Sequence, residues 1–425
     1  MTGTKTLTIT TALAGMLAGR VGAVDWPQYR GPNHDGTSPE TILTTWPSGG
    51  LRPIWKHPLH NGFSAITVGG GKAFTLVTRE VEGADQEVCV ALDANTGNEL
   101  WAVPLGAAVY DEGGNRGAED NNGGDGPRST PAFDSGKVYT YSSKMVLKCL
   151  DAASGRQIWA CDLIREHDGR NIHWESAASP VVEGELVLVA GGGRGQALLA
   201  FDKNDGHVVW KGQDDAMTQS TPVVATILDQ RQVIFFTQKG LVSVVPTTGA
   251  VLWRYPYSFR VATAMTPVVS GDIVYCSAAY GVGSSACQIS KTANGFEARR
   301  LWFQPANVLQ SHWSTPVCSQ GYLFGISGQA KFGAAPLVCV ELATGKSMWS
   351  HEGFGPGGCT LVDGHVLVLS DAGDLVLVKA TPAGYQEAGR SHVLAGKCWN
   401  SAGVSGGRIY ARSTKEGVSV DVSVR

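Results

Sequence analysis

The sequence has few charged residues and no long apolar run beyond its N-terminal region. Only 17% of the 425 residues are charged, the formal net charge is -3, and no block of like charge occurs. A basic face is the usual footprint of a nucleic-acid-binding protein, so we expect no nucleic-acid partner. A membrane-spanning helix needs about 20 mostly apolar residues, and no later stretch supplies them, so we expect no transmembrane segment.

The nine cysteines form no C-x-x-C pair, and their number is odd. Both facts disfavour a zinc site or a thioredoxin-like redox site. Cys89, Cys149 and Cys339 lie inside apolar runs, where a small buried hydrophobe is the simplest interpretation. An exported chain can still form one or two disulfides, with Cys276 and Cys287 the easiest pair to envisage, but the sequence alone does not pair the cysteines.

The N-terminus has the pattern of a secretory signal peptide at residues 1–23. Lys5 gives a weakly positive start, residues 7–17 are mildly apolar, and residues 21–23 (VGA) suit cleavage after Ala23. A lipoprotein signal would need a lipid-accepting cysteine after residues 17–19, where Arg20 stands instead. We therefore expect an exported protein, periplasmic or extracellular, with a signal peptide that has no lipobox cysteine. The alternative is an ordinary N-terminal segment.

Glycine is abundant, with 55 residues, and much of it belongs to one repeated pattern. The pattern is an apolar run, Asp-x-x-x-Gly, three residues and Trp, as in LDANTGNELW (92–101), LDAASGRQIW (150–159) and FDKNDGHVVW (201–210). Residues 244–253 and 340–349 are degenerate copies, residues 290–302 carry three extra residues before the Trp, and residues 379–394 have lost it. An aspartate that accepts backbone N–H groups, followed by a glycine at positive φ, predicts a β-hairpin turn.

The tryptophan of each copy is expected to cover the edge of a blade and to pack against the next one. We assign this structural role to Trp55, Trp101, Trp159, Trp210, Trp253, Trp302 and Trp349.

A second landmark precedes each hairpin and allows the repeats to be counted. It is a lead-in of Ser/Thr-Pro type, an apolar run, a glycine and a second apolar run, and its copies begin near residues 63, 128, 176, 219, 263, 313, 357 and 400. Each lead-in with its hairpin supplies about four strands, which is one propeller blade. The sequence therefore predicts an all-β protein, an eight-bladed β-propeller of four-stranded antiparallel blades. The segment LRPIWKHPL (51–59) is expected to complete the last blade, so that an N-terminal strand closes the ring. The propeller would span residues 51–425 as one domain, after an N-terminal extension at 24–50.

The repeats resemble the PQQ-like β-propeller repeat family of bacterial exported proteins, over essentially the whole mature chain. Three features carry the resemblance: DWPQYRGPNHDG (25–36), GDGPRSTP (124–131) and the repeated LDA-x-x-G-x-x-x-W hairpin. The wider superfamily includes quinoprotein alcohol dehydrogenases and the propeller lipoprotein of the outer-membrane barrel-assembly machinery. A shared fold does not fix a function, so the site residues must decide it.

The resemblance implies two functions. A quinoprotein dehydrogenase would stack PQQ in the central funnel between a Trp and the ring of two adjacent disulfide-bonded cysteines, with calcium held by Glu, Asn and Asp. This sequence has no adjacent cysteines and no such ligand set, so PQQ with calcium is expected only under this alternative, and we otherwise expect no cofactor. The preferred hypothesis is a non-catalytic, monomeric binding or protein-interaction scaffold, whose partner is an unknown protein or a small carbohydrate-like ligand.

The residues just before the innermost strand of each blade should gather at one mouth of the channel. The candidates for ligand binding there are Arg128, His173, Trp174, Gln219, His312, Trp313, Trp399 and Asn400. Aromatic walls with a few converging polar groups suit a small-molecule pocket. The alternative is that the tryptophans plug the channel and each histidine bonds to backbone. We assign no catalytic or metal-binding residue. The acidic loop at 108–128 has oxygen ligands suited to calcium but no EF-hand spacing, so a solvated loop is the preferred interpretation and a calcium site the alternative.

Overall fold

The computed structural model describes residues 24–110, 126–259, 263–305, 309–328 and 335–424. The expected signal peptide and most of the acidic loop lie outside the described residues. The part of the chain described here contains a single short helix, α1 (Leu163–Glu166), and no helix in it is long and apolar enough to cross a membrane.

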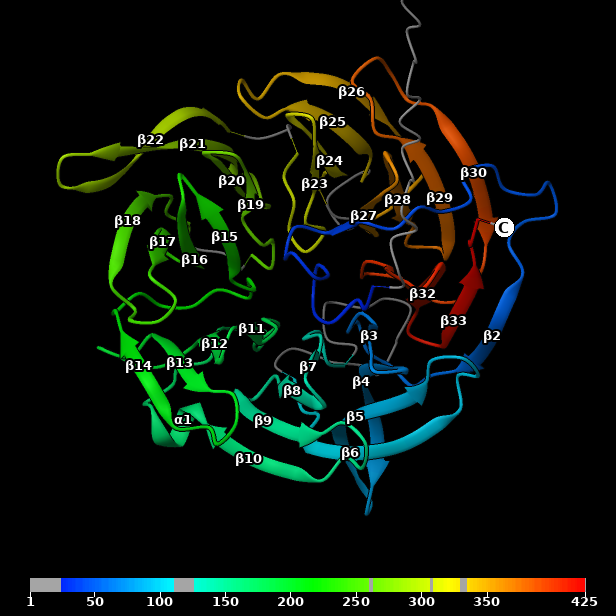
Figure 1. The fold of residues 1–425 in the computed structure, drawn as a ribbon, viewed down its shortest axis with the longest axis horizontal. Helices are drawn as coiled ribbons and strands as arrows, with labels where there is room; N and C mark the ends of the chain where they lie inside the picture. The colour runs from blue at the N-terminus through cyan, green and yellow to red at the C-terminus, as the bar shows by residue number, and fades with distance from the viewer. Residues whose placement is uncertain (1–23, 111–125, 260–262, 306–308, 329–334, 425) are drawn as a thin grey trace, which may run out of the picture.

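The strands form eight sheets that surround a central axis, which is an eight-bladed β-propeller (Figure 1). Blade 1 comprises β3 (Thr67–Gly69), β4 (Lys72–Val81), β5 (Ala84–Asp93) and β6 (Glu99–Ala107), and blade 2 comprises β7 (Ala132–Asp134), β8 (Lys137–Tyr141), β9 (Val146–Asp151) and β10 (Gln157–Asp162). Blade 3 comprises β11 (Val181–Glu183), β12 (Leu186–Ala190), β13 (Leu198–Asp202) and β14 (Val208–Gly212), and blade 4 comprises β15 (Val223–Ile227), β16 (Gln230–Thr237), β17 (Gly240–Val244) and β18 (Val251–Pro256).

Blades 5 to 8 continue the same order around the ring. Blade 5 comprises β19 (Val268–Ser270), β20 (Ile273–Ala278), β21 (Gly283–Thr292) and β22 (Gly295–Gln304), and blade 6 comprises β23 (Val317–Ser319), β24 (Tyr322–Ile326), β25 (Leu337–Glu341) and β26 (Ser347–His351). Blade 7 comprises β27 (Gly358–Val362), β28 (His365–Leu369), β29 (Asp374–Lys379) and β30 (Glu387–His392), and blade 8 comprises β31 (Gly403–Ser405), β32 (Arg408–Arg412), β33 (Glu416–Asp421) and β2 (Pro53–Pro58). Neighbouring strands within each blade are antiparallel, as the sequence predicts.

The ring is closed by the N-terminal strand. β2 pairs antiparallel with β33 and so supplies the outer strand of blade 8, which confirms the predicted closure. Arg412, fully buried, extends from blade 8 to blade 1, where its guanidinium donates to Leu76 O, His60 O and Thr75 Oγ1. The junction that joins the two ends of the chain therefore has both a sheet and a buried cation across it.

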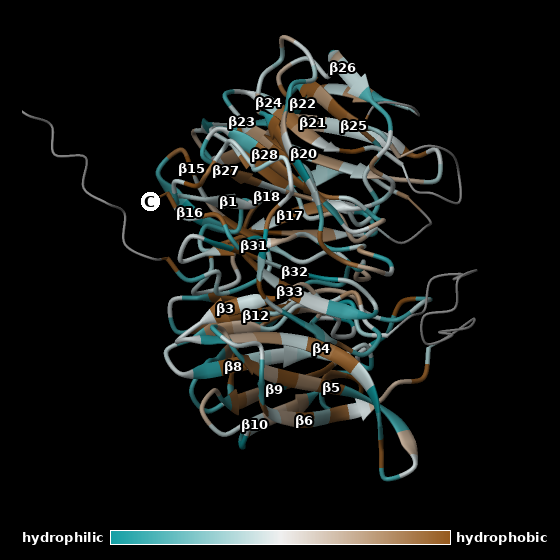
Figure 2. Cartoon of the chain, turned by 90° about the vertical axis from the view of Figure 1, so that its right-hand side faces the viewer, coloured by the Kyte–Doolittle hydropathy of each residue, from teal (hydrophilic) through white to brown (hydrophobic). Residues whose placement is uncertain are grey.

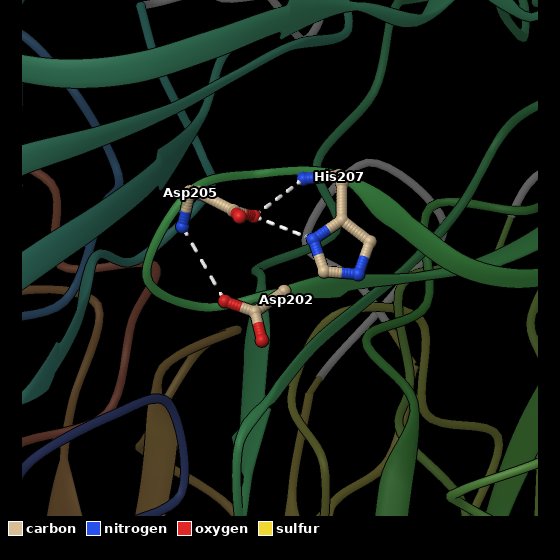
Figure 3. A group of neighbouring side chains, drawn as sticks. All are labelled: Asp202, Asp205 and His207. Carbon is tan, nitrogen blue, oxygen red and sulfur yellow. Dashed lines mark hydrogen bonds and ion pairs between the residues drawn. The ribbon is translucent and has the colours of Figure 1, made fainter.

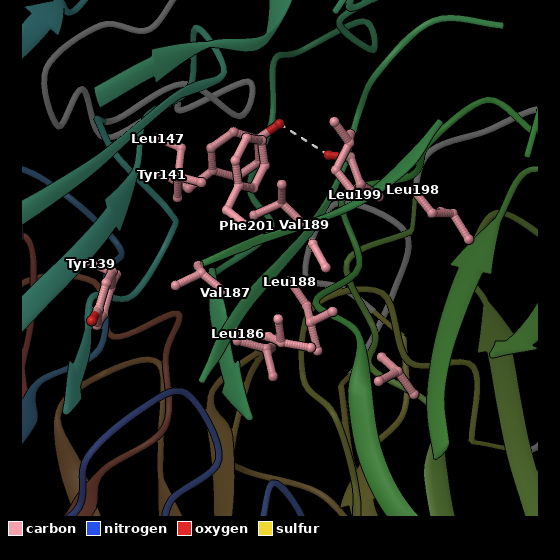
Figure 4. Packing of buried hydrophobic residues seen from close by; sticks show 14 of the residues in the cluster. Tyr139, Tyr141, Leu147, Leu186, Val187, Leu188, Val189, Leu198, Leu199 and Phe201 are labelled. Carbon is pink, nitrogen blue, oxygen red and sulfur yellow. Dashed lines mark hydrogen bonds between the residues drawn. The ribbon is translucent and has the colours of Figure 1, made fainter. Parts of the chain in front are cut away.

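The core lies between the faces of adjacent blades. Apolar residues concentrate in the strands and polar residues in the turns (Figure 2). Between blades 2 and 3, Tyr141 and Leu147 pack against Val189 and Phe201, and the Tyr141 hydroxyl donates to Ala190 O (Figure 4). Burying such side chains contributes roughly 1.5–3 kcal/mol each, and the same contact type recurs around the ring.

The repeated hairpin links each blade to the next through its tryptophan. Trp159 at the outer strand of blade 2 lies against Gly206 in the turn of blade 3, and its Nε1 donates to Lys203 O. A Cβ on Gly206 would come within 2.6 Å of the indole, and the φ of this glycine is +78°. The same tryptophan-on-glycine contact occurs at Gly97, Gly155, Gly249 and Gly345.

Blade 7 has no tryptophan of its own at this position. In the other blades the tryptophan follows a register shift in the outer strand, and in β30 the corresponding residue is Gly389. The space is filled by Trp46 of the N-terminal extension, whose ring lies where a Cβ of Gly389 would stand. The degenerate last hairpin is thus completed by a residue from a distant part of the sequence.

The Ser/Thr-Pro lead-ins form hydrogen bonds between neighbouring blades. The hydroxyl before the proline accepts a backbone N–H from the preceding blade: Thr130 from Ala65, Ser179 from Thr130, and Thr221 from Ser179. Thr315 accepts in the same way from the N–H of Thr266. These hydroxyls tie the lead-ins of neighbouring blades to one another around the channel.

The cysteines form no disulfide. All nine are described and all are free thiols, eight of them buried. Cys276 and Cys287 lie on paired strands, but Cys276 is opposite Ser285 and Cys287 is opposite Val274. The disulfide that seemed easiest from the sequence is therefore not formed.

Candidate functional site

The lead-in residues form a continuous ring at one end of the channel, here called the funnel mouth (residues 61–64, 127–130, 173–176, 218–220, 263–265, 310–314, 354–357 and 398–401). Hydrogen bonds link its neighbours, such as Phe63 N to Pro127 O and Ala264 N to His312 O. The Trp313 indole donates to Pro356 O in blade 7. The ring predicted from topology is therefore present in the described residues; Ala262 lies outside them.

Aromatic side chains fill one half of the mouth. Trp399 of blade 8 stacks with Phe63 of blade 1 (centroids 5.1 Å apart) and with Trp313 of blade 6 (4.8 Å apart). Blades 6 and 8 are not neighbours, so the two indoles extend past blade 7 to reach each other. His312, buried at the base of the stack, lies edge-on to Trp313 and to Tyr280.

The other half of the mouth is held by polar contacts to two consecutive backbone carbonyls. The carbonyl of Trp174 accepts from the Arg128 guanidinium at 2.5 Å, and the Gln219 amide donates to Glu175 O at 2.7 Å and to Trp174 O at 3.4 Å. Trp174 and Glu175 both have left-handed φ angles, 65° and 60°, which non-glycine residues adopt at a cost of about 1–2 kcal/mol each. His173 is exposed and its ring is 4.2 Å from that of Trp174. The strained pair is thus fixed by side chains from blades 2 and 4.

The charged groups near the mouth are balanced by nearby partners. Glu175 is buried and pairs with Lys144 at 2.7 Å. Glu87, which is 1% exposed, accepts from the Tyr110 hydroxyl and from Ser143 N, and burial raises the pKa of its carboxyl. Burial also lowers the pKa of His312 to about 4, with a smaller contribution from the Arg128 charge, so the imidazole is neutral near pH 7. The site therefore presents aromatic faces, neutral polar groups and two cations, Arg128 and Lys397, the second of which lies 5.0 Å from the centroid of the Trp399 ring.

Several buried polar atoms at the mouth have no hydrogen-bond partner within the described residues. They are Ser129 Oγ, Ser176 Oγ, His312 Nδ1, Ser314 Oγ and Asn400 Oδ1. Buried polar atoms in folded proteins are nearly always satisfied by protein or solvent, so these atoms are unused hydrogen-bonding capacity around the mouth. Asn400 uses its amide nitrogen to donate to Arg412 O, which leaves its oxygen directed elsewhere.

Sequence reasoning nominated the aromatic and polar residues of the lead-ins and missed the buried carboxylate of Glu87. Glu87 was not a candidate, although it is a charged residue directly before the apolar run VCVAL, which is a usable signal; Glu175 was expected at the mouth beside His173 and Trp174 but was given no role. Of the nominated residues, His312, Trp313 and Trp399 are brought into contact, and Arg128, Trp174 and Gln219 form the second group. The tryptophans thus occupy much of the mouth, as the plug alternative expected, while the unsatisfied atoms keep the ligand alternative open.

The mouth does not fit the quinone site that the resemblance implies. Trp399 uses its faces on Phe63 and Trp313, and the neighbouring Cys398 is a lone buried thiol between Lys397 and Trp399. Of the acidic residues close to the mouth, Glu87 and Glu175 are engaged by protein donors, and the half-buried Asp371 carboxyl lies beside the Trp399 indole.

One group of possible metal ligands occurs elsewhere, on the exposed turn of blade 3 (Figure 3). Its carboxylates serve the turn itself: Asp202 accepts from the N–H groups of Asn204 and Asp205, and Asp205 accepts from His207. We assign no metal site to it.

Comparison with known proteins identifies the family. A family model described as outer membrane protein assembly factor BamB matches residues 84–315, more than half of the chain. The chain belongs to this family. Among curated BamB proteins, that of Moranella endobia is 26% identical over 276 residues, and that of Shewanella oneidensis is 25% identical over 231 residues. These matches cover 60% and 53% of this chain and 66% and 57% of the relatives, so the chain spans less than two thirds of their length.

Solved structures show how widely the BamB-family fold is shared. The BamB structure from Moraxella catarrhalis aligns with a TM-score of 0.60 at 17% identity, covering 88% of this chain and 98% of that one. A quinohemoprotein alcohol dehydrogenase from Comamonas testosteroni aligns with a TM-score of 0.65 at 14% identity, covering 96% and 82%. Identities this low establish the fold and leave the function to the site.

Proposed function

We propose that this protein is an exported, non-catalytic propeller that acts as a protein-interaction scaffold in the assembly of outer-membrane proteins. The observation that carries the proposal is membership of the BamB family over residues 84–315, the blades that hold most of the funnel mouth. The relatives are named as outer membrane protein assembly factors, and their role is extended to this chain as part of the proposal.

The geometry of the mouth agrees with a scaffold. A general base needs a free, titratable group poised near the working pH. His312 is buried and its pKa is about 4, and the buried carboxyl of Glu87 is held by Tyr110 and Ser143. These residues build a rigid face, and rigid loops on a stable ring are well suited to binding a partner.

Site-specific crosslinking in the native host tests the proposal. A photo-crosslinking amino acid at His173, which is exposed at the mouth, should capture a component or a client of the outer-membrane assembly machinery. The matched control places the same group at Ile164 of α1, which is exposed on the outside of the ring. Capture of assembly proteins at neither position, with the protein exported and folded, would contradict the proposal.

A second candidate function is binding of a small carbohydrate-like ligand at the mouth. It is favoured by the unsatisfied Ser129, Ser176, Ser314, His312 and Asn400 atoms in a ring that also holds half-buried indoles, since sugars need both hydroxyl partners and aromatic faces. Saturation-transfer NMR with neutral mono- and disaccharides should show contacts that Trp313→Ala removes. An absence of transfer from every sugar would exclude this candidate.

A further inference from the structure

The first part of the N-terminal extension, residues 24–38, lies along the innermost strands, in the centre of the ring (Figure 1). In each innermost strand, the residue before the last one points its backbone N–H toward the axis of the ring, away from the neighbouring strand of the blade. The extension accepts three of these: Val68 N donates to Trp26 O, Phe133 N to Pro27 O, and Val182 N to the Gln28 side chain. The extension therefore satisfies the inner edges of blades 1, 2 and 3 in turn.

In blade 7 the extension goes further and adds a strand. β1 (Thr37–Ser38) pairs parallel with β27, opposite Leu361 and Val362, and Leu361 N donates to Gly36 O. β27 has five residues, whereas the innermost strands of blades 1, 2, 3, 5, 6 and 8 have three. In blade 7, therefore, the innermost strand is longer than in these six blades, and its inner edge is paired with β1.

Blade 4 has the same long inner strand without a strand paired to it. β15 also has five residues, and its turn of two residues closes on the Ile227–Gln230 pair. This register directs the N–H groups of Val224 and Thr226 away from β16 and toward the axis. Among the described residues, the extension makes no hydrogen bond to Thr226 or to Val269, the corresponding residue of blade 5.

A cavity of about 280 Å³ lies at this open edge. Its walls are residues 223–226 of β15, residues 267–269 of blade 5, and the Arg30–Asp35 turn of the extension, with Arg231 at one side. Ligand cavities for small molecules typically start at roughly 300 Å³, so the space suits two or three residues of an extended chain rather than a folded domain.

Arg30 forms part of the wall of the same cavity. Its side chain is 6% exposed, and its guanidinium donates to three backbone carbonyls: Thr315 O, Pro316 O and Asp35 O. Its Nε is buried and has no partner within the described residues. The charges close to it, Asp35 and the Arg231–Glu183 pair, sum to about neutral with Arg30 itself. The wall of the cavity is therefore close to neutral, which favours an uncharged occupant such as a peptide backbone.

We propose that this cavity binds a short extended segment of a partner polypeptide, which pairs with the inner edge of β15 as β1 pairs with β27. A backbone C=O of the segment would accept from the N–H of Thr226, which is exposed at this edge, and a backbone N–H of the segment would donate to Thr226 O. Main-chain pairing to a sheet edge gives affinity with little demand on sequence. The proposal deepens the scaffold function and rests on it for the nature of the partner.

The test is peptide binding to the full-length mature chain. The probe is a dye-labelled, capped pentapeptide of alternating threonine and valine, followed by fluorescence anisotropy, with a second probe N-methylated at alternate residues. The wild-type protein should bind the first probe saturably and the methylated probe at least about tenfold more weakly, because methylation removes backbone donors. Thr226→Pro should cause a similar loss, since proline removes the edge N–H but is tolerated on a strand edge. Thr226→Val keeps that N–H and should bind like wild type.

Each other outcome overturns the proposal. These outcomes are no saturable binding by the wild type, equal binding of the methylated probe, or equal loss in Thr226→Val and Thr226→Pro. The methylated probe needs no variant, so a misfolded Thr226→Pro leaves the test intact. Failure of this assay with successful crosslinking at the mouth would refute the cavity alone, whereas peptide binding without capture of assembly proteins would refute the proposed function alone.

Discussion

Replacing Gly206 with alanine tests the physical basis of the repeat. Gly206 has φ +78°, and its Cβ would lie 2.6 Å from the Trp159 indole. The left-handed conformation costs an alanine about 1–2 kcal/mol, of which roughly 0.4–1 kcal/mol is recovered from the less flexible unfolded chain. Displacing the buried Trp159 adds about 1–3 kcal/mol of overpacking, together with loss of its hydrogen bond to Lys203 O. We expect Gly206→Ala to lower the free energy of unfolding by about 2–4 kcal/mol.

The same blade supplies a matched control. Gly184 has φ +58°, but a Cβ there would have no atom within 4 Å. Gly184→Ala should therefore lower the free energy of unfolding by only about 1 kcal/mol, the conformational part alone. Urea unfolding followed by tryptophan fluorescence measures both variants. Equal losses would refute the reasoning, because they would show that contact with the tryptophan is not what requires glycine in the turn.

Three further predictions follow from the site and the ring. Thr221→Val leaves the buried Ser179 N–H without its acceptor and should lower the free energy of unfolding in urea by about 1–3 kcal/mol. A change below about 0.5 kcal/mol, the usual scatter for surface substitutions, would contradict the role of the lead-in hydroxyls. The pKa values of His34 and His312 are lowered to about 4 by burial, below the 6.5 of the unfolded chain, so the unfolded state binds protons first and stability should fall as pH drops from 6.5 toward 4. Between these pH values the free energy of unfolding should change by up to about 1.4 kcal/mol per pH unit for each histidine. His312→Gln should remove the contribution of one histidine, measured as the difference between the free energies of urea unfolding at pH 7 and pH 5. Addition of PQQ and calcium should produce neither bound-quinone absorbance nor dye-linked alcohol oxidation, and either signal would restore the dehydrogenase alternative.

The blades were predictable because each repeats the same local chemistry. An aspartate, a glycine and a tryptophan at fixed spacing define a hairpin without any distant contact, as in Asp202, Gly206 and Trp210. The lead-ins define the inner strands equally well, so eight copies gave eight blades. Closure by residues 51–59 followed because the last blade lacked one strand.

The extension was not predictable, because its contacts are set by the whole ring. Residues 24–50 show neither strand alternation nor the repeat, and Arg30 or Trp46 finds its partners only after the blades have assembled. The mouth lies between these cases. Topology places His312, Trp313 and Trp399 at one end of the channel, but only packing shows that the two indoles reach each other across blade 7.

Loss of the protein from its native host tests the central claim most directly. The measurement is the fraction of folded outer-membrane β-barrel proteins, resolved by heat-modifiable mobility in membranes from wild-type, deletion and complemented cells. A scaffold for outer-membrane protein assembly predicts a lower folded fraction in the deletion strain and full recovery on complementation. Unchanged folded fractions, with the protein verified as exported in the wild type, would contradict the proposed function.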